Sequence, residues 1–493
     1  MSSPATNTTS LSNKDTLLCA IGSPTTKLTE TELREHLIKF VQHVGPRDDI
    51  LLIPPDHTRI HSQAGTITRL LYDLYHPRQT QNEPIAEETP AKKRKTAETP
   101  DMTILPALGT HAPMTRLEIQ NMFGNDLAQK YEELFLVHDW RNDVVTVGQV
   151  SADMVSKATH GQVTHQTWPA QVNKHVWNKR HEVTKQNTNQ KYPSLIVSIG
   201  QVVPHEVLGM ANYNKNLLVG CGGKDGINWS HFIGAVYGME QILGQADNPL
   251  RDILQQASVE FLEPQLDLWY ILTVVSPDTT TGDLCVRGLY IGKDIQCYQA
   301  ACDLSLQVNF TLLEKPVETM VVYLDPSEFH STWLGNKAIY RTRMALADGG
   351  TLYVLAPGVE KFGEDGIVDG LIRKYGYRGT PVTLQAMKDH QELRENLSAV
   401  AHLIHGSSEG RFRIVYCPGH LSKDEIEGVG FDYGVWDEIQ TKYDVNKLQT
   451  GWHTDGAGDE FYFIRNPALG LWAIPSRFES SKSAMSPTQQ AAT

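Results

Sequence analysis

The segment Ile50–Ser62, with the sequence ILLIPPDHTRIHS, joins an apolar run directly to a group of polar side chains. The apolar run is short and aliphatic, which is typical of a buried strand of a parallel sheet. Similar runs alternate along the chain with amphipathic segments, and this alternation predicts an α/β fold with mostly parallel sheets. Strands are expected at 49–54, 103–108, 134–137, 195–199, 269–275, 320–324, 351–355 and 413–416, and helices at 30–44, 64–75, 114–123, 229–243 and 382–404.

The length of 493 residues favours two large domains, because single cores stop growing beyond roughly 250–300 residues. A polar, Pro-containing stretch near 312–317 is the expected boundary. We predict two Rossmann-like α/β domains, 15–315 and 316–478, with an active site in the cleft between them. Whether the last segment of the second domain returns to the first domain is left open. The polar tails 1–14 and 479–493 are expected to be flexible, and 79–101 to be a disordered insertion in a surface loop.

The net charge limits the classes of partner. There are 44 Lys+Arg against 57 Asp+Glu, so the formal charge is −13. Such a chain is a poor nucleic-acid binder, since phosphate recognition needs a concentrated basic face. No apolar run reaches the roughly 18 residues of a membrane span and the N-terminus has no signal-peptide pattern, so no membrane is expected and the predicted location is the cytoplasm. The six cysteines lack C-x-x-C spacing and favour buried, reduced thiols.

Polar side chains follow three of the expected strands. Asp56, His57 and Arg59 follow the first, His111 follows the second within GTH, and His205 follows the third within PH. Ligands of open α/β sheets bind at the carboxyl ends of the strands, so these side chains are candidates for one site. Arg59 offers a two-pronged donor for a carboxylate or phosphate, and the histidines can exchange protons near neutral pH. For any one of these histidines taken singly, a structural hydrogen bond is the more common role.

Two more residues extend this set. Lys215 lies ten residues after His205, and His231 lies at the head of an amphipathic helix. A histidine at the start of a helix can be a metal ligand, but without a second ligand close in sequence it is weak evidence for a metal site. From residue chemistry alone the sequence predicts an anion-binding pocket with proton-transferring groups, and no particular reaction.

The ordered set DHTR, GTH-x-P-x-T, then PH with a lysine ten residues on and a histidine sixteen residues after that, resembles the nickel-dependent lactate racemase family. The resemblance covers about 53–231 and extends more faintly to Lys337. It implies a nickel-pincer nucleotide (pyridinium-3-thioamide-5-thiocarboxylic acid mononucleotide) covalently bound to Lys215, with His231 as the protein ligand of nickel. It implies further that His111 and His205 are the two acid/base residues. Asp56 then contributes to cofactor binding, and Arg59 and Lys337 bind the substrate carboxylate.

The chain departs from the family pattern in two places. Where the family has a glycine-rich turn before the lysine, this chain reads GMANYNK, with Asn212 and Tyr213 in place of small residues. Lys224 is a possible competitor for the cofactor, although spacing favours Lys215. A glutamine is expected three residues before Lys337 in a lactate enzyme, whereas this chain has Leu334 and Gly335 there. The pocket for the substrate side chain is therefore expected to differ from that of a lactate enzyme.

The leading hypothesis is a racemase or epimerase of a small 2-hydroxy acid, which depends on cofactor-biosynthesis proteins as partners. Hydride removal at the hydroxyl-bearing carbon gives a planar 2-keto acid, and two histidines on opposite faces then serve the two stereoisomers. Two alternatives stay open at this level. One is a cofactor-free hydroxyacid-binding homologue, and the other is a zinc-dependent hydrolase that uses His57, His111 and His205.

Overall fold

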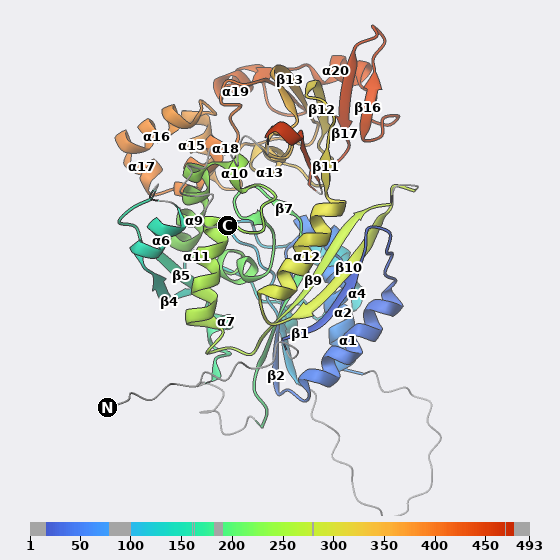
Figure 1. The fold of residues 1–493 in the computed structure, drawn as a ribbon, viewed down its shortest axis with the longest axis vertical. Coiled ribbons are helices and arrows are strands. Elements are labelled where there is room, and N and C mark those ends of the chain that lie inside the picture. The colour runs from blue at the N-terminus through green and yellow to red at the C-terminus, as the bar shows by residue number, and fades with distance from the viewer. Residues whose placement is uncertain are drawn as a thin grey trace, which may run out of the picture.

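The computed structural model describes residues 16–77, 100–159, 161, 163–181, 191–278, 281–468 and 470–477 (Figure 1). Both predicted tails and nearly all of the predicted insertion at 79–101 lie outside the described residues; Asp101, the last residue of that stretch, begins a strand. None of the helices in the described part is both long enough and apolar enough to cross a membrane.

The first of two six-stranded sheets is built from the N-terminal part of the chain. Its strand order is β1-β10-β9-β6-β2-β3, and the four strands β9, β6, β2 and β3 are parallel. The antiparallel edge of β10 and β1 was not predicted from the sequence. The bounds are β1 Leu17–Gly22, β2 Asp49–Ile53, β3 Asp101–Ile104, β6 Leu195–Gln201, β9 Leu268–Pro277 and β10 Leu284–Gly292.

Helices cover both faces of this sheet (Figure 1). α1 (Glu30–Val44) begins at a capping box made by Thr29 and Glu32, and it has the predicted bounds, as does α2 (Ala64–Tyr75). The expected strand at 134–137 is wrong: α5 (Tyr131–Leu134) occupies its start, and Phe135 makes only an isolated bridge to Ile104. The other helices of this part are η1 His57–Ser62, α3 Arg116–Phe123, α4 Asn125–Gln129, α6 Ala152–Ala158, α7 Lys174–Trp177, η2 Asn216–Gly220, α9 Lys224–Tyr237, α10 Met239–Ile242, α11 Pro249–Ala257, η3 Ser258–Leu262 and α12 Ile295–Val308.

The second six-stranded sheet is built from the C-terminal part, in the order β15-β14-β13-β12-β17-β16. All its neighbours are parallel except β16 and β17. The single helix expected at 382–404 is wrong, because the chain breaks at His390 and Asn396, which both have non-helical backbone angles. The bounds are β12 Val317–Tyr323, β13 Leu346–Ala356, β14 Arg413–Pro418, β15 Asp432–Tyr433, β16 Gly451–Thr454, β17 Glu460–Ile464, α13 Thr332–Gly335, α14 Lys337–Tyr340, α15 Gly366–Tyr375, α16 Thr380–Asp389, α17 Gln391–Arg394, α18 Leu397–His405, α19 Lys423–Gly428 and α20 Trp436–Lys442.

Three short pairs of strands complete the described structure: β4 Val144–Val150 with β5 Trp168–Asn173, β7 Pro204–His205 with β8 Gly209–Met210, and β11 Phe310–Leu312 with β18 Leu471–Ala473. The last pair is parallel, so the end of the described chain runs back alongside the segment that precedes the second sheet.

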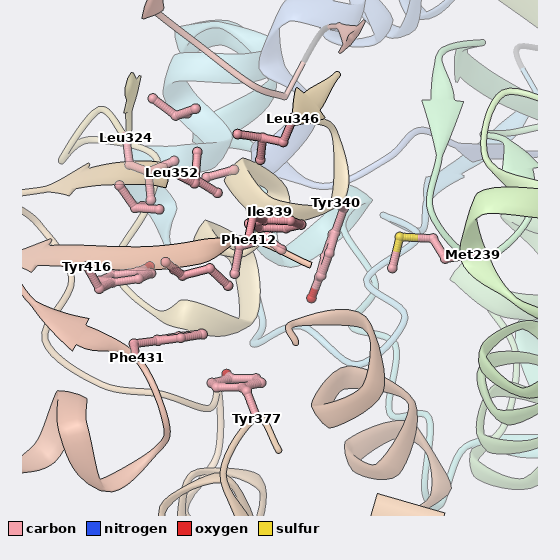
Figure 2. Close-up of a cluster of buried hydrophobic side chains, with 14 of the residues drawn as sticks. Met239, Leu324, Ile339, Tyr340, Leu346, Leu352, Tyr377, Phe412, Tyr416 and Phe431 are labelled. Atoms are coloured by element: carbon pink, nitrogen blue, oxygen red, sulfur yellow. The ribbon is translucent and has the colours of Figure 1, made fainter. Parts of the chain in front are cut away.

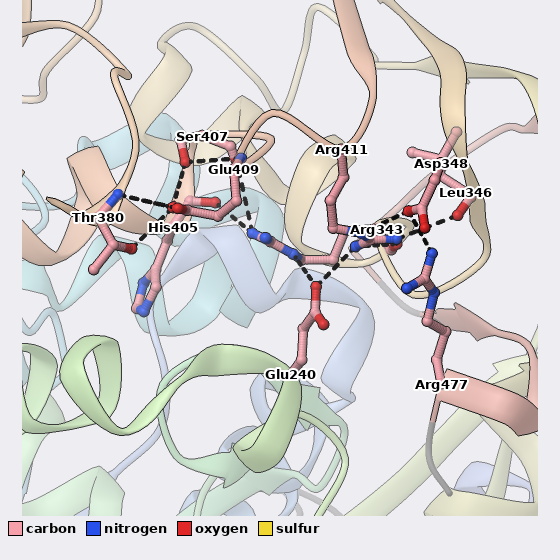
Figure 3. A network of polar contacts seen from close by, with 10 residues as sticks. All are labelled: Glu240, Arg343, Leu346, Asp348, Thr380, His405, Ser407, Glu409, Arg411 and Arg477. Atoms are coloured by element: carbon pink, nitrogen blue, oxygen red, sulfur yellow. Dashed lines mark hydrogen bonds and ion pairs between the residues drawn. The ribbon is translucent and has the colours of Figure 1, made fainter. Parts of the chain in front are cut away.

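Apolar packing and ion pairs connect the two parts of the chain. Met239 of α10 belongs to the same buried cluster as Tyr340 and the core of the second sheet (Figure 2). Glu240, the next residue, accepts hydrogen bonds at 2.9 Å from both Arg343 and Arg411 (Figure 3). α9 also packs along α18. The mixed α/β fold with mostly parallel sheets predicted from the sequence is confirmed.

Candidate active site

One cavity gathers every residue that the sequence singled out through the family resemblance. Its wall is formed by three strand ends of the first sheet, by the loop and helix that follow β6, and by a short stretch next to the second sheet. The predicted residues on this wall are Asp56, Arg59, His111, His205, Lys215, His231 and Lys337. Gln201, Glu206, Asn212, Asn216, Trp333 and Leu334 are among the other residues that line it.

Main-chain and amide contacts bring the strand ends together. β2 and β3 stay in register past their ends, where Pro55 bridges Ala107. The Asn216 amide donates to the Ile53 carbonyl and to the Ser198 hydroxyl, both at 3.0 Å, and so ties β2 to β6. The polar residues that follow these strands therefore meet on one side of the sheet, as expected for the carboxyl ends of parallel strands.

His111 is held by a buried carboxylate. Its Nδ1 lies 2.5 Å from Asp56 Oδ2, and the Thr58 hydroxyl donates to Asp56 Oδ1 at 2.6 Å. Burial alone would raise the pKa of Asp56, but the charge of His111 and these hydrogen bonds outweigh it and lower the pKa to about 2. The carboxylate is therefore ionised and accepts a hydrogen bond from Nδ1–H, so the neutral ring has its lone pair on Nε2. His111 is arranged to accept a proton.

His205 has the opposite arrangement. Its Nδ1 accepts hydrogen bonds from the backbone N–H groups of Val207 at 3.1 Å and Leu208 at 3.3 Å. A nitrogen that accepts two donors carries no proton, so the neutral ring is protonated on Nε2. Burial is the main cause that lowers the pKa of His205 well below its usual value, although Glu206 opposes the shift. His205 thus offers an N–H group rather than a lone pair.

The loop before Lys215 adopts a left-handed backbone at two residues that are not glycine. Asn212 and Tyr213 have positive φ angles of 64° and 61°. Asparagine tolerates this region, but for tyrosine it costs about 1–3 kcal/mol. Tyr213 is fully buried and stacks on Tyr298 at 5.2 Å between ring centroids. Tertiary packing therefore enforces the conformation that the family pattern assigns to small residues.

A buried arginine fixes the same loop from behind. Arg251 of α11 is 1% exposed and donates to the Met210 carbonyl at 2.8 Å and to Asn214 Oδ1 at 2.5 Å. It also donates to the Asn212 carbonyl at 3.4 Å. These contacts fix the backbone that carries Lys215.

The two lysines of the cavity have weakened basicity. Burial first, and then the positive charge of Arg59, lower the pKa of Lys215 to about 8. The same two causes lower the pKa of Lys337 to about 8. A sizeable fraction of each amine is therefore neutral near pH 7.5, and a neutral amine is the nucleophilic form.

His231 lies in the middle of α9 rather than at its head, and no described residue hydrogen-bonds to its Nε2. Its Nδ1 donates to the Ile227 carbonyl at 2.8 Å, which leaves the lone pair on Nε2. Burial lowers the pKa of His231 and so favours the neutral ring. A neutral imidazole whose second nitrogen donates to a carbonyl is the usual form of a histidine metal ligand.

Two other sequence candidates lie elsewhere. His57 turns toward Glu118, with 3.9 Å between Nδ1 and Oε1, and is not among the described residues on the cavity wall. Lys224 begins α9, where its backbone N–H donates to the Trp140 carbonyl, and it is not among the described residues on the cavity wall.

Sequence reasoning missed Glu206, which follows His205 directly. Glu206 lines the cavity, and its Oε2 is buried without a hydrogen-bond partner in the described structure. Arg341 Nη2 lies 3.8 Å from it. Burial opposes ionisation of Glu206, but the charges of His205, Arg341 and Lys337 hold its pKa well below the usual range. Only its position beside His205 could have drawn attention to it.

Residues 32–241 match the lactate racemase N-terminal domain family. The match contains Asp56, His111, His205, Lys215 and His231, so the resemblance seen in the motifs is confirmed. No curated protein matches the chain significantly.

Two solved structures have a similar fold. A protein from Thermotoga maritima is 21% identical, with a TM-score of 0.73, over 92% of this chain and 100% of that chain. The lactate racemase apoprotein from Thermoanaerobacterium thermosaccharolyticum is 16% identical, with a TM-score of 0.62, over 91% of this chain and 93% of that chain. At these identities the likeness concerns the fold, and it extends over both sheets.

Proposed function

We propose that this protein is a racemase or epimerase of a small 2-hydroxy acid and that it works with a nickel-pincer nucleotide bound to Lys215. The observation that carries the proposal is the shared cavity, on whose wall the residues of the family motif meet with complementary hydrogen-bonding states. The family match of residues 32–241 supports the same reaction class.

The donor set fits the cofactor. Lys215 has the lowered pKa that a covalent tether needs, and Nε2 of His231 is free to bind nickel. One imidazole from the protein would suffice, because the nucleotide would bring its own soft donors for nickel. When bound, this group supplies hydride acceptance and return at C2 of the substrate.

The chain's own residues then handle the carboxylate and the protons. Arg59 and Lys337 hold the substrate carboxylate from two sides of the cavity. His111, held by Asp56, takes the hydroxyl proton as the C2 hydrogen leaves, and the product of this step is a planar 2-keto acid. His205 donates an Nε2–H hydrogen bond to the oxygen from the opposite face. The proton that His111 has taken returns to this oxygen when hydride is delivered to the other face of C2, so the proton and the charge balance.

The two sheets suggest how the cavity is closed. We propose that they belong to two Rossmann-like domains, 15–315 and 316–478, and that the active site lies in the cleft between them. Lys337 comes from the second part and the other predicted residues from the first. The proposal retains two sequence-based expectations, dependence on cofactor-biosynthesis proteins and a cytoplasmic location.

The zinc hydrolase alternative needs three imidazoles around one ion. His57 lies against Glu118, while Nδ1 of His111 is engaged by Asp56 and Nδ1 of His205 by backbone N–H groups. Within the described residues there is no group of three or more His, Cys, Asp or Glu side chains placed to hold a metal. The geometry therefore favours the racemase reading.

The test is peptide mass spectrometry with nickel quantification on protein made in cells that also make the pincer nucleotide. We expect a nucleotide-sized adduct on the peptide that contains Lys215, together with one nickel per chain. Lys215→Arg should abolish the adduct, whereas the matched variant Lys224→Arg should keep it. An unmodified Lys215 and no nickel would refute the cofactor assignment and favour a cofactor-free binding protein.

A further inference from the structure

Glu206 is a charged group in the cavity with unused hydrogen-bonding capacity. Its Oε2 is buried and lacks a hydrogen-bond partner within the described structure, and the nearest cation, Arg341 Nη2, is 3.8 Å away. Its Oε1 lies 3.9 Å from Nε2 of His205. Both distances exceed a hydrogen bond, so the carboxylate can accept donors from a molecule in the cavity.

Arg341, the cation that faces Glu206, also has hydrogen-bonding capacity that is not satisfied. Arg341 is fully buried, and its Nε and Nη2 have no hydrogen-bond partner among the described residues. A buried polar atom left unpaired costs free energy, and such atoms in native structures commonly receive a ligand or water. Gln201 Oε1, on the wall of the same cavity, is a second buried acceptor without a partner in the described part of the chain.

The charges around the cavity favour a bound molecule whose hydrogen-bond donor is neutral rather than positively charged. Arg59 and Lys337 line the cavity and Arg341 lies behind it, against the two carboxylates Asp56 and Glu206, and Lys215 is not counted because its amine is consumed in the proposed bond to the cofactor. Asp56 is already used by His111. The cavity therefore has an excess of positive charge, which suits one substrate carboxylate and disfavours an additional ammonium group.

We propose that Glu206 makes this site selective for 2-hydroxy monocarboxylates that carry a further hydroxyl group on the carbon chain. The added hydroxyl donates to the carboxylate of Glu206, and a second carboxylate at that position is repelled by it. This inference rests on the proposed function, because it takes the 2-hydroxy acid from there. The inference goes beyond that function by naming the chemical group that the pocket recognises on the carbon chain of the substrate.

Three acids of similar size test the selectivity. Glycerate and 2-hydroxybutyrate have the same number of heavy atoms. They differ only at the end of the chain, which is a hydroxyl group in glycerate and a methyl group in 2-hydroxybutyrate. Malate has a second carboxylate instead. Dissociation constants are measured by titration calorimetry, and KM and kcat by chiral chromatography, on protein made with the cofactor. Glycerate should bind about 10-fold more tightly than 2-hydroxybutyrate, as expected for a hydrogen bond to a charged acceptor. Malate should bind most weakly.

Variants assign the effect to Glu206. Glu206→Gln should reduce the preference for glycerate to about 2-fold and improve malate binding, whereas Glu133→Gln, which removes an exposed carboxylate on α5, should change neither. Equal binding of glycerate and 2-hydroxybutyrate by the unmodified protein overturns the proposal, as does a preference for malate. This comparison does not depend on the folding of any variant.

The two proposals fail in different ways. Inversion of both monocarboxylates with equal efficiency would leave the racemase function standing and remove the role of Glu206. A preference for glycerate that depends on Glu206, in protein that inverts none of the acids, would keep the selectivity and refute the racemase.

Discussion

His111 and His205 both line the cavity and both follow strands of the same sheet, yet their rings have different hydrogen-bonding states. On one side a carboxylate, Asp56, engages Nδ1 of His111 and leaves Nε2 ready to accept a proton. On the other side two backbone N–H groups engage Nδ1 of His205 and leave the proton on Nε2. The difference teaches that the hydrogen-bond partner of the remote nitrogen, rather than the histidine itself, sets the direction in which each ring can act.

Replacement of His111 should have the largest effect. His111→Asn removes the acceptor, and we expect the racemisation rate to fall about 1000-fold, within the usual range for loss of a general base. Rates are measured by chiral chromatography, with cofactor loading checked by mass spectrometry. A loss of less than 10-fold in fully loaded protein would mean that His111 is not the proton acceptor.

Replacement of Arg251 should destabilise the loop that lies on the His205 side. Arg251→Met leaves the Met210 carbonyl and Asn214 without their buried donor, and we expect unfolding free energy to fall by about 3 kcal/mol. Urea denaturation measures this change. An unchanged midpoint would show that the loop holds its shape without this side chain.

The Asp56 side should be sensitive to acid. The folded pKa of Asp56 is lowered to about 2 from a usual value of 3.8, so its stabilising contribution is complete above about pH 4 and is lost as the pH falls toward 2. This shift corresponds to roughly 2 kcal/mol. Asp56→Asn should lose that part of the pH dependence in urea denaturation at pH 2–6. A variant that keeps the full acid dependence would contradict the ionised pair.

Replacement of His205 should have the smallest effect on rate. His205→Asn retains an N–H donor near the same position, so we expect a loss of about 10-fold, far below that of His111→Asn. The two variants are compared in the same chiral assay at equal cofactor loading. Equal losses would mean that His205 also accepts protons during the reaction and that the two sides are equivalent.

Much of the site could be predicted because it follows local rules. Apolar runs that end in polar residues mark the carboxyl ends of parallel strands, and this placed Asp56, His111 and His205 on one side of a sheet. The helix expected at 382–404 failed for a related reason. The periodic pattern there continues across residues such as Asn396, where the backbone leaves the helical region.

The sequence by itself determined the α/β class, the strand ends and the residue types of the pocket, because periodicity and spacing are properties of neighbouring residues. Only the tertiary structure decided the protonation states of the two histidines, the left-handed conformation of Tyr213 and the burial of Glu206. Each of these depends on groups far away in the chain: His111 lies 55 residues from Asp56, and Arg251 lies 41 residues from Met210. Desolvation and hydrogen bonding act through space, so no local pattern encodes them.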